Sequence, residues 1–168
     1  MDQGYIYVCD STALIDLYQH FPRRFRRLRR LVSEGVVKIP EGVYRELRRK
    51  SDNLRRNIEK WASKYQFVIS MRQNQQLQNE FIRIEKAYGE KIRVGEREYK
   101  GFWKSSKGRR SADGQVIAVG KVFGYIVVSD DQAIRLACML ENVRCIGWTE
   151  FARWIGMLGS QGQLGFQF

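Results

Sequence analysis

The stretch from Ser111 to Ile134, SADGQVIAVGKVFGYIVVSDDQAI, contains the pattern that decides the fold. Apolar residues in Val116–Phe123 recur at helical spacing, and the apolar run Tyr125–Val128 that follows is the clearest expected strand of the chain. The polar turn Ser129–Asp131 comes directly after this run, and a second helical pattern begins behind it. A helix, a buried strand, a polar turn and another helix in this order are typical of an α/β fold.

The same alternation continues on both sides of this stretch. We expect further short strands, separated by helical patterns, at Tyr5–Cys9, Val36–Ile39, Phe67–Ile69 and Val143–Ile146. Strands that alternate with helices predict a parallel sheet covered by helices on both faces. The length of 168 residues suits one domain, which we expect to span residues 1–155. Residues 156–168 are rich in Gly and Gln and are expected to form a flexible tail.

Composition and charge narrow the classes of partner. The chain has 30 Lys and Arg against 18 Asp and Glu, a formal net charge of +12. This surplus favours a polyanionic partner such as nucleic acid, although a soluble basic protein would also show it. The three cysteines have no regular spacing, and the chain shows neither a signal peptide nor an apolar run long enough to cross a bilayer. We therefore expect a cytoplasmic protein without a membrane partner.

Four acidic residues stand at positions that favour catalysis. Asp10 follows the first strand, and Asp131 follows the strand Tyr125–Val128. Glu46 and Asp113 lie on helices that can lean over the same edge, where catalytic groups of parallel sheets gather. Carboxylates that converge repel one another unless a cation bridges them, and hard oxygen ligands suit Mg²⁺ or Mn²⁺. A bound ion of this kind can activate water for attack on a phosphodiester.

Each of these carboxylates also has a purely structural explanation. Asp10, Asp113 and Asp131 are all placed to cap helix N-termini, and Glu46 is placed to pair with Lys50 at i,i+4. Four acids at strand ends of a basic chain are therefore more informative as a set than any one of them alone.

Four segments of the chain resemble the ordered motifs of PIN domains. VCDSTALIDL resembles the opening motif, and IPEGVYREL, with Glu46, resembles the second. SADGQVIAVGKVFGYIVVSDDQAI is similar to the third and fourth together, with the family's pattern falling on the residues Asp113, Ile117, Ala118, Gly124, Ser129 and Asp131. The resemblance covers residues 5–150. It departs at Ser129, where Thr is commoner, and in residues 52–110, which are longer than in compact members.

The resemblance carries specific implications. It implies a sheet of about five parallel strands and Mg²⁺- or Mn²⁺-dependent cleavage of RNA. It implies that Asp10, Glu46, Asp113 and Asp131 hold the metal and that Ser129 supports Asp10 or a ligand water, with Asp130 as an alternative ligand. Small prokaryotic members are often toxins, so an antitoxin protein is a candidate partner, as is a second copy in a homodimer.

Basic segments offer surfaces for the substrate. Residues 89–110 show no sustained period and are expected to form a loop or hairpin. Lys104, Lys107, Arg109 and Arg110 lie in this segment just before Asp113, and we assign them, together with Ser11, to substrate binding. Two further clusters occur: six arginines between Phe21 and Arg30, and the residues Arg48, Arg49, Lys50, Arg55 and Arg56. Each cluster also fits a solvated helix face.

The leading hypothesis from the sequence is a metal-dependent endoribonuclease of PIN type, in the setting of a toxin and its antitoxin. A non-catalytic RNA-binding or ribosome-associated module with the same fold is the first alternative. A structure-specific DNA nuclease is the second, because flap-cutting enzymes share related folds and acids. The single histidine, His20, excludes a ribonuclease mechanism that needs a pair of histidines. The chain also contains no P-loop motif.

Overall fold

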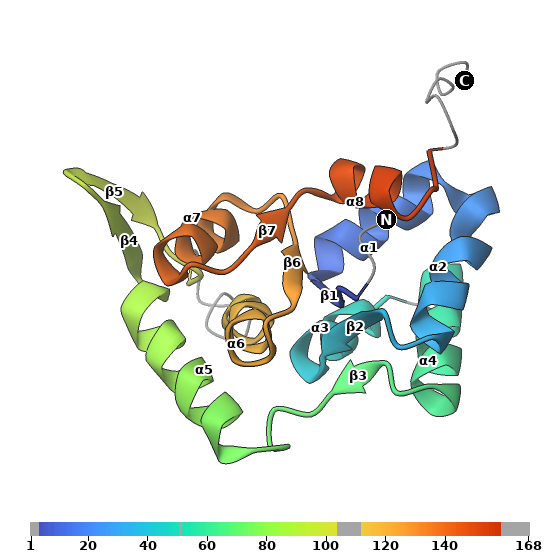
Figure 1. The fold of residues 1–168 in the computed structure, drawn as a ribbon, viewed down its shortest axis with the longest axis horizontal. Coiled ribbons are helices and arrows are strands. Elements are labelled where there is room, and N and C mark those ends of the chain that lie inside the picture. The colour runs from blue at the N-terminus through green and yellow to red at the C-terminus, as the bar shows by residue number, and fades with distance from the viewer. Residues whose placement is uncertain (1–3, 51, 104–111, 159–168) are drawn as a thin grey trace.

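A parallel sheet lies at the centre of the computed structural model, which describes residues 4–50, 52–103 and 112–158 (Figure 1). The sheet has five strands in the order β3-β2-β1-β6-β7, and each neighbouring pair is parallel. Their bounds are Tyr7–Cys9 (β1), Val37–Pro40 (β2), Val68–Ile69 (β3), Ile126–Val128 (β6) and Cys145–Ile146 (β7). This arrangement confirms the expected α/β fold, with a five-stranded parallel sheet flanked by helices in a single domain.

The two central strands explain why the sequence shows continuous apolar runs. All residues of β1 and β6 are buried, and the strands pair in register from Tyr7 opposite Ile126 to Cys9 opposite Val128. A strand covered on both faces has no solvent side, so its residues are apolar without alternation. The register brings the ends of β1 and β6 level, so Asp10 and Ser129, the next residue after each strand, emerge at the same edge.

Helices cover both faces of the sheet (Figure 1). Their bounds are Ser11–His20 (α1), Phe25–Ser33 (α2), Glu41–Leu47 (α3), Asn53–Lys64 (α4), Gln75–Tyr88 (α5), Asp113–Phe123 (α6), Gln132–Glu141 (α7) and Trp148–Trp154 (α8). Helices α5 and α6 lie on one side of the sheet, while α1, α2 and α4 lie on the other. Pro22 opens a short 3-10 turn that separates α1 from α2, as its fixed φ and missing N–H predict. Gly124, with a φ of 72°, ends α6 in the left-handed region before β6 begins.

The long segment between α3 and α6 contributes to the sheet as well as projecting from it. Strand β3 belongs to the sheet, and α4 contacts α2. Beyond α5, strands β4 (Lys91–Val94) and β5 (Arg97–Lys100) form the antiparallel hairpin that the sequence allowed for. Helix α5 lies outside α6 on its side of the sheet, and the hairpin projects beyond the end of α5 (Figure 1).

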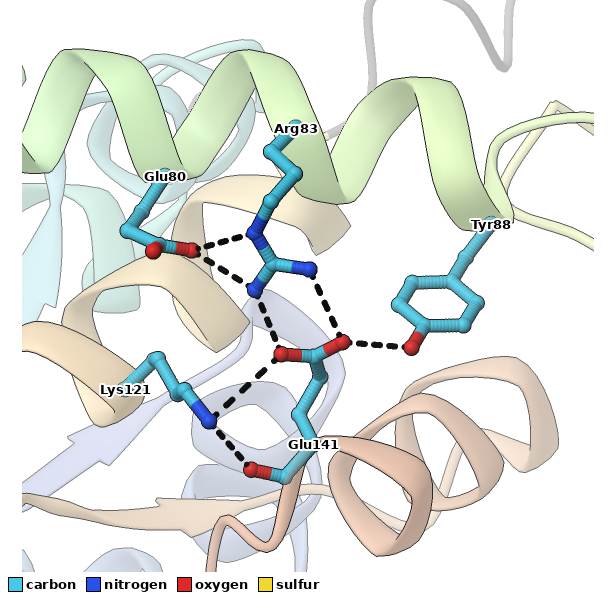
Figure 2. A network of polar contacts seen from close by, with 5 residues as sticks. All are labelled: Glu80, Arg83, Tyr88, Lys121 and Glu141. Atoms are coloured by element: carbon cyan, nitrogen blue, oxygen red, sulfur yellow. Dashed lines mark hydrogen bonds and ion pairs between the residues drawn. The ribbon is translucent and has the colours of Figure 1, made fainter.

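Glu141, at the end of α7, joins three helices through one carboxylate (Figure 2). The guanidinium of Arg83 on α5 donates to both of its oxygens, at 3.2 and 2.5 Å, and Lys121 on α6 lies 3.6 Å away. The hydroxyl of Tyr88 also donates to it at 2.5 Å. These cations lower the pKa of Glu141 to about 2. The contacts hold the projecting helix α5 against the body of the domain.

The packed chain continues beyond the boundary expected at residue 155. Met157 is fully buried, and its carbonyl accepts a hydrogen bond from Arg24 at 2.6 Å. The remainder of the expected tail, residues 159–168, lies outside the described residues.

Within the part of the chain that the structure describes, no helix is both long enough and apolar enough to cross a membrane.

Candidate active site

Asp10 lies at the end of β1, where it also begins α1. Its Oδ1 atom accepts a hydrogen bond from the backbone N–H of Ala13 at 2.8 Å, so the residue is a helix cap, as the structural alternative proposed. Its other oxygen, Oδ2, accepts from the hydroxyl of Ser129 at 2.5 Å. Capping therefore occupies one carboxylate oxygen, while the second faces the neighbouring strand end.

Ser129 connects the ends of the two central strands. It is completely buried directly after β6, and its Oγ atom both donates to Asp10 and accepts from the backbone N–H of Asp131 at 3.0 Å. Asp131 in turn begins α7, and its Oδ1 accepts from the N–H of Ala133 at 3.1 Å. One hydroxyl thus fixes the position of Asp10 relative to the turn that carries Asp131.

The surroundings of Asp10 disfavour its negative charge. Burial is the main reason that its pKa is raised to about 6, and the nearby charges of Asp131 and Asp130 contribute in the same direction. The hydrogen bonds from Ser129 and Ala13 oppose this rise without overcoming it. Among the described residues no cation forms an ion pair with Asp10. The electrostatics are those of a site that would gain from a positive charge.

Glu46 lies on α3, the helix that follows β2, and reaches the same edge of the sheet as Asp10. Its Oε1 accepts from the hydroxyl of Ser11, the residue after Asp10, at 3.2 Å. Burial raises the pKa of Glu46, while hydrogen bonds from Ser11 and the backbone N–H of Ala112 act against this rise. The hydroxyl of Ser11 therefore orients Glu46, and the binding of substrate by Ser11 stays a prediction. No ion pair joins Glu46 to Lys50 among the described residues, so the surface-pair alternative does not account for Glu46.

Asp113 is the first residue of α6 and is half-buried. Helix α6 leads through Gly124 into β6 and packs against β1, β2 and β6. Its N-terminus therefore lies over the edge where these strands end. The preceding residue, Ala112, donates to Glu46, which places Asp113 beside the acidic group and not at the opposite end of the sheet.

Gln115 holds α3 and α6 together, although the sequence did not single it out. It is buried, and its side-chain oxygen accepts from the backbone N–H of Gly42 at 2.8 Å. A Cβ atom at Gly42 would meet that oxygen at 2.7 Å and the Cβ of Ala112 at 2.9 Å, so only glycine permits this approach. The signal in the sequence that could have identified Gln115 is a polar residue within an otherwise apolar helix. The contact positions Glu46 relative to Asp113.

The donor set fits a hard divalent cation in its chemistry. In residues 4–50, 52–103 and 112–158, no three His, Cys, Asp or Glu side chains form a ready-made metal group. The carboxylates nevertheless share one edge, offer only oxygen donors, and include one that burial and like charges keep at a raised pKa. Asp130, the alternative ligand, accepts instead from the backbone N–H of Trp148 at 3.1 Å. Close approach of Asp10, Asp113 and Asp131 around an ion stays a prediction.

The structure describes only part of the segment that was predicted to bind substrate. Lys104, Lys107, Arg109 and Arg110 lie outside the described residues. Trp103, an aromatic residue in this segment that could in principle stack on bases, is half-buried, and its indole N–H donates to Glu85 at 2.7 Å. This bond fixes the indole against α5, a packing role that the basic surroundings of Trp103 did not reveal.

Comparisons with known proteins agree with the architecture. Residues 7–157 match the family model described as "Domain of unknown function (DUF4411)". The crystal structure of PAE2754 from Pyrobaculum aerophilum is similar, with a TM-score of 0.50 and 15% identity over 91% of this chain and 92% of that one. At this identity the likeness concerns the fold alone. No curated protein matches the sequence.

Proposed function

This chain belongs to the DUF4411 family, and we propose that it is a metal-dependent endoribonuclease. One observation carries the proposal: Asp10 is a buried carboxylate with a pKa of about 6, with Asp130 and Asp131 nearby and without an ion-pair partner among the described residues. Placing such a group beside like charges is unfavourable unless a bound ion compensates for it. The ordered resemblance to PIN motifs and the net charge of +12 support the same conclusion.

The roles follow from the positions of the side chains. Asp10, Glu46, Asp113 and Asp131 would hold Mg²⁺ or Mn²⁺, which when bound supplies an activated water and stabilises charge on the phosphate. Ser129 keeps Asp10 ionised and oriented through its donated hydrogen bond. Ser11 does the same for Glu46. The basic residues Lys104–Arg110 would draw the RNA backbone toward this edge. An antitoxin or a second copy of the chain would be further partners.

The test is single-turnover cleavage of single-stranded RNA with Mg²⁺, with Mn²⁺ and with EDTA. We expect cleavage with either metal and none in EDTA, and a loss of about a thousandfold or more in Asp10→Asn. Asp52→Asn is a matched control, because Asp52 also caps a helix, through Arg55 at 2.9 Å, but is exposed. It should cleave normally. Equal cleavage in EDTA would contradict the metal mechanism.

RNA that is bound but never cut, under any metal, would instead support the non-catalytic module. Cutting restricted to branched DNA would support the structure-specific DNA nuclease.

A further inference from the structure

A basic groove of about 760 Å³ lies between α2 and α4, the two helices on the right of Figure 1. None of the residues of the acidic edge lines it. Five of its lining residues are cationic: Arg23, Arg26, Arg29, Arg56 and Lys60. None of the lining residues is acidic, so the groove concentrates positive charge without internal compensation.

The arginines near α2 divide into two sets by their contacts. In one set, Arg24 and Arg27 donate to the carbonyls of Met157 and Ile155, each at 2.6 Å, while Arg30 pairs with Glu34 at 3.2 Å. These side chains hold the C-terminal segment or bind within their own helix. The other set contains every third residue one position earlier: Arg23, Arg26 and Arg29.

Arg23, Arg26 and Arg29 have no such structural role. All three are exposed and line the groove, and within the described ranges none of them forms an ion pair. Residues three apart share one face of a helix, so these guanidinium groups form a row. Arg26 and Arg29 lie on α2, and Arg23 lies on the 3-10 turn that leads into it.

Trp61 and two asparagines complete the lining of the groove. Trp61 lines the groove and is 2% exposed, yet its indole N–H has no hydrogen-bond partner in the described part of the chain. This N–H is enclosed by the domain, so Trp61 gives the groove a rigid base and its indole N–H is not presented to a ligand. Asn53 and Asn57 add amide groups along the α4 side of the groove.

We propose that this groove binds the sugar–phosphate backbone of single-stranded RNA, away from the position of cleavage. The three arginines can contact neighbouring phosphates from the α2 side of the groove, and Arg56 and Lys60 face them from α4. Arginine forks bind phosphate oxygens in pairs, and the amides of Asn53 and Asn57 suit sugar hydroxyls. The groove would thereby add an anchoring subsite to the proposed endoribonuclease. The proposal rests on that proposed function only in naming RNA as the polymer.

An acidic protein fits the groove less well than RNA. Protein interfaces usually have a fully buried apolar centre inside a polar rim. Here the large apolar side chains Phe25 and Trp61 are already buried in the domain, at 6% and 2% exposure. The polar groups that the groove presents are chiefly cationic, which suits a polymer recognised through its phosphates.

The experiment compares the wild type with the triple variant R23Q/R26Q/R29Q. Binding of fluorescently labelled single-stranded RNA is measured by anisotropy across a salt series in EDTA, with the RNA checked for integrity afterwards. We expect the triple variant to bind about tenfold more weakly at low salt. Its log–log salt slope should fall by about 2, since each lost phosphate contact removes about 0.7.

A matched control removes three exposed charges elsewhere: K86Q/R97Q/K100Q. These residues lie on α5 and the hairpin and do not line the groove. The control should keep nearly the wild-type slope. An equal loss in both variants would show that net charge alone drives binding, and an unchanged triple variant would also overturn the proposal. Far-UV circular dichroism should show both variants folded, because all the replaced side chains are exposed.

A polyglutamate peptide and inorganic phosphate serve as alternative probes. Polyglutamate that binds the wild type as tightly as RNA, and loses binding in the triple variant, would assign the groove to an acidic protein and reject RNA. Phosphate that competes fully with RNA at equal phosphate concentration would reduce the groove to a site for a small anion.

The experiments can reject the RNA-binding groove and the nuclease activity independently of each other. Normal RNA binding by the triple variant, in a protein that cuts RNA with Mg²⁺, would reject the groove alone. Groove-dependent binding without any cleavage would reject the nuclease alone.

Discussion

Asp10 and Glu141 are both nearly buried carboxylates, with 6% and 8% exposure, but their surroundings are opposite. Glu141 contacts two cations of the chain, Arg83 and Lys121, and its pKa falls to about 2. Asp10 receives one hydroxyl and one backbone N–H, faces further acids, and has a pKa of about 6. Cations of the domain compensate the charge of Glu141. Among the described residues, no cation pairs with Asp10.

This difference separates a structural carboxylate from a candidate functional one. Glu141 ties α5 to α6 and α7, and its partners Arg83, Tyr88 and Lys121 are not residues of the acidic edge (Figure 2). In the proposed enzyme a cation from solution would do for Asp10 what Arg83 does for Glu141. The comparison predicts opposite pH dependences and opposite effects of charge removal at the two positions.

The largest effect on stability is expected for Asp10→Asn. The folded-state pKa of about 6 lies above the usual 3.8, so the native state binds the additional proton between about pH 4 and pH 6. The contribution of Asp10 to stability therefore declines as the pH rises through this window. At pH 7 without metal, the asparagine variant should be more stable by about 2–3 kcal/mol. Urea unfolding at pH 4 and pH 7 measures the difference.

The control for this prediction is again Asp52→Asn, which changes an exposed cap and should leave stability nearly unchanged at both pH values. Mg²⁺ should stabilise the wild type at pH 7 and have little effect on Asp10→Asn. A gain that is equal at pH 4 and pH 7 would mean that the raised pKa of Asp10 is not its cause.

The sequence predicted the sheet and the edge well because both depend on local patterns. The apolar runs before Asp10 and Ser129 gave the two central strands, and their ends gave the position of the acids. The hydroxyl support of Asp10 came from the PIN resemblance and coincides with the hydrogen bond from Ser129. Helix caps were foreseen for Asp10 and Asp131 from their place before apolar helices.

Contacts between residues that are far apart in the chain could not be predicted from the sequence. Glu141 is an acidic residue in the last turn of a helix, where the helix dipole disfavours it, and its partner Arg83 is 58 residues away. No local pattern indicates such a pair. The division of the α2 arginines into two sets does follow a three-residue step in the sequence. Their different roles, however, depend on where the C-terminal segment packs.

A smaller effect of opposite sign is expected for Glu141→Gln. The folded-state pKa of about 2 lies below the usual 4.5, so the stabilisation by Glu141 is present above about pH 4.5 and is lost as the pH falls toward 2. Because Arg83 and Lys121 are partly exposed, the loss at pH 7 should be about 1–2 kcal/mol. Glu80→Gln removes only the half-buried partner of Arg83 and should cost less than the loss of the buried Glu141. Equal losses in the two variants would contradict the central place of Glu141.

The smallest effect on stability is expected for Ser129→Ala, which tests how the hydroxyl of Ser129 controls the pKa of Asp10. The hydroxyl lowers the pKa of Asp10 by donating to Oδ2 and also accepts from the N–H of Asp131. Without it the pKa of Asp10 should rise further, and the backbone N–H of Asp131 would lose this acceptor. We expect a loss of about 1 kcal/mol in stability.

We also expect the rise of single-turnover cleavage with pH to shift to higher pH in Ser129→Ala, because Asp10 must lose its proton to bind a metal ion. Ser63→Ala provides the control, since its hydroxyl bonds only to the carbonyl of Lys60 on an exposed helix face. Its cleavage profile should match the wild type. A Ser129→Ala profile that keeps its midpoint while its rate falls at every pH would assign Ser129 to positioning Asp131. The hydrogen bond to Asp10 would then be a consequence of packing, and the contrast between Asp10 and Glu141 would rest on burial and neighbouring charge alone.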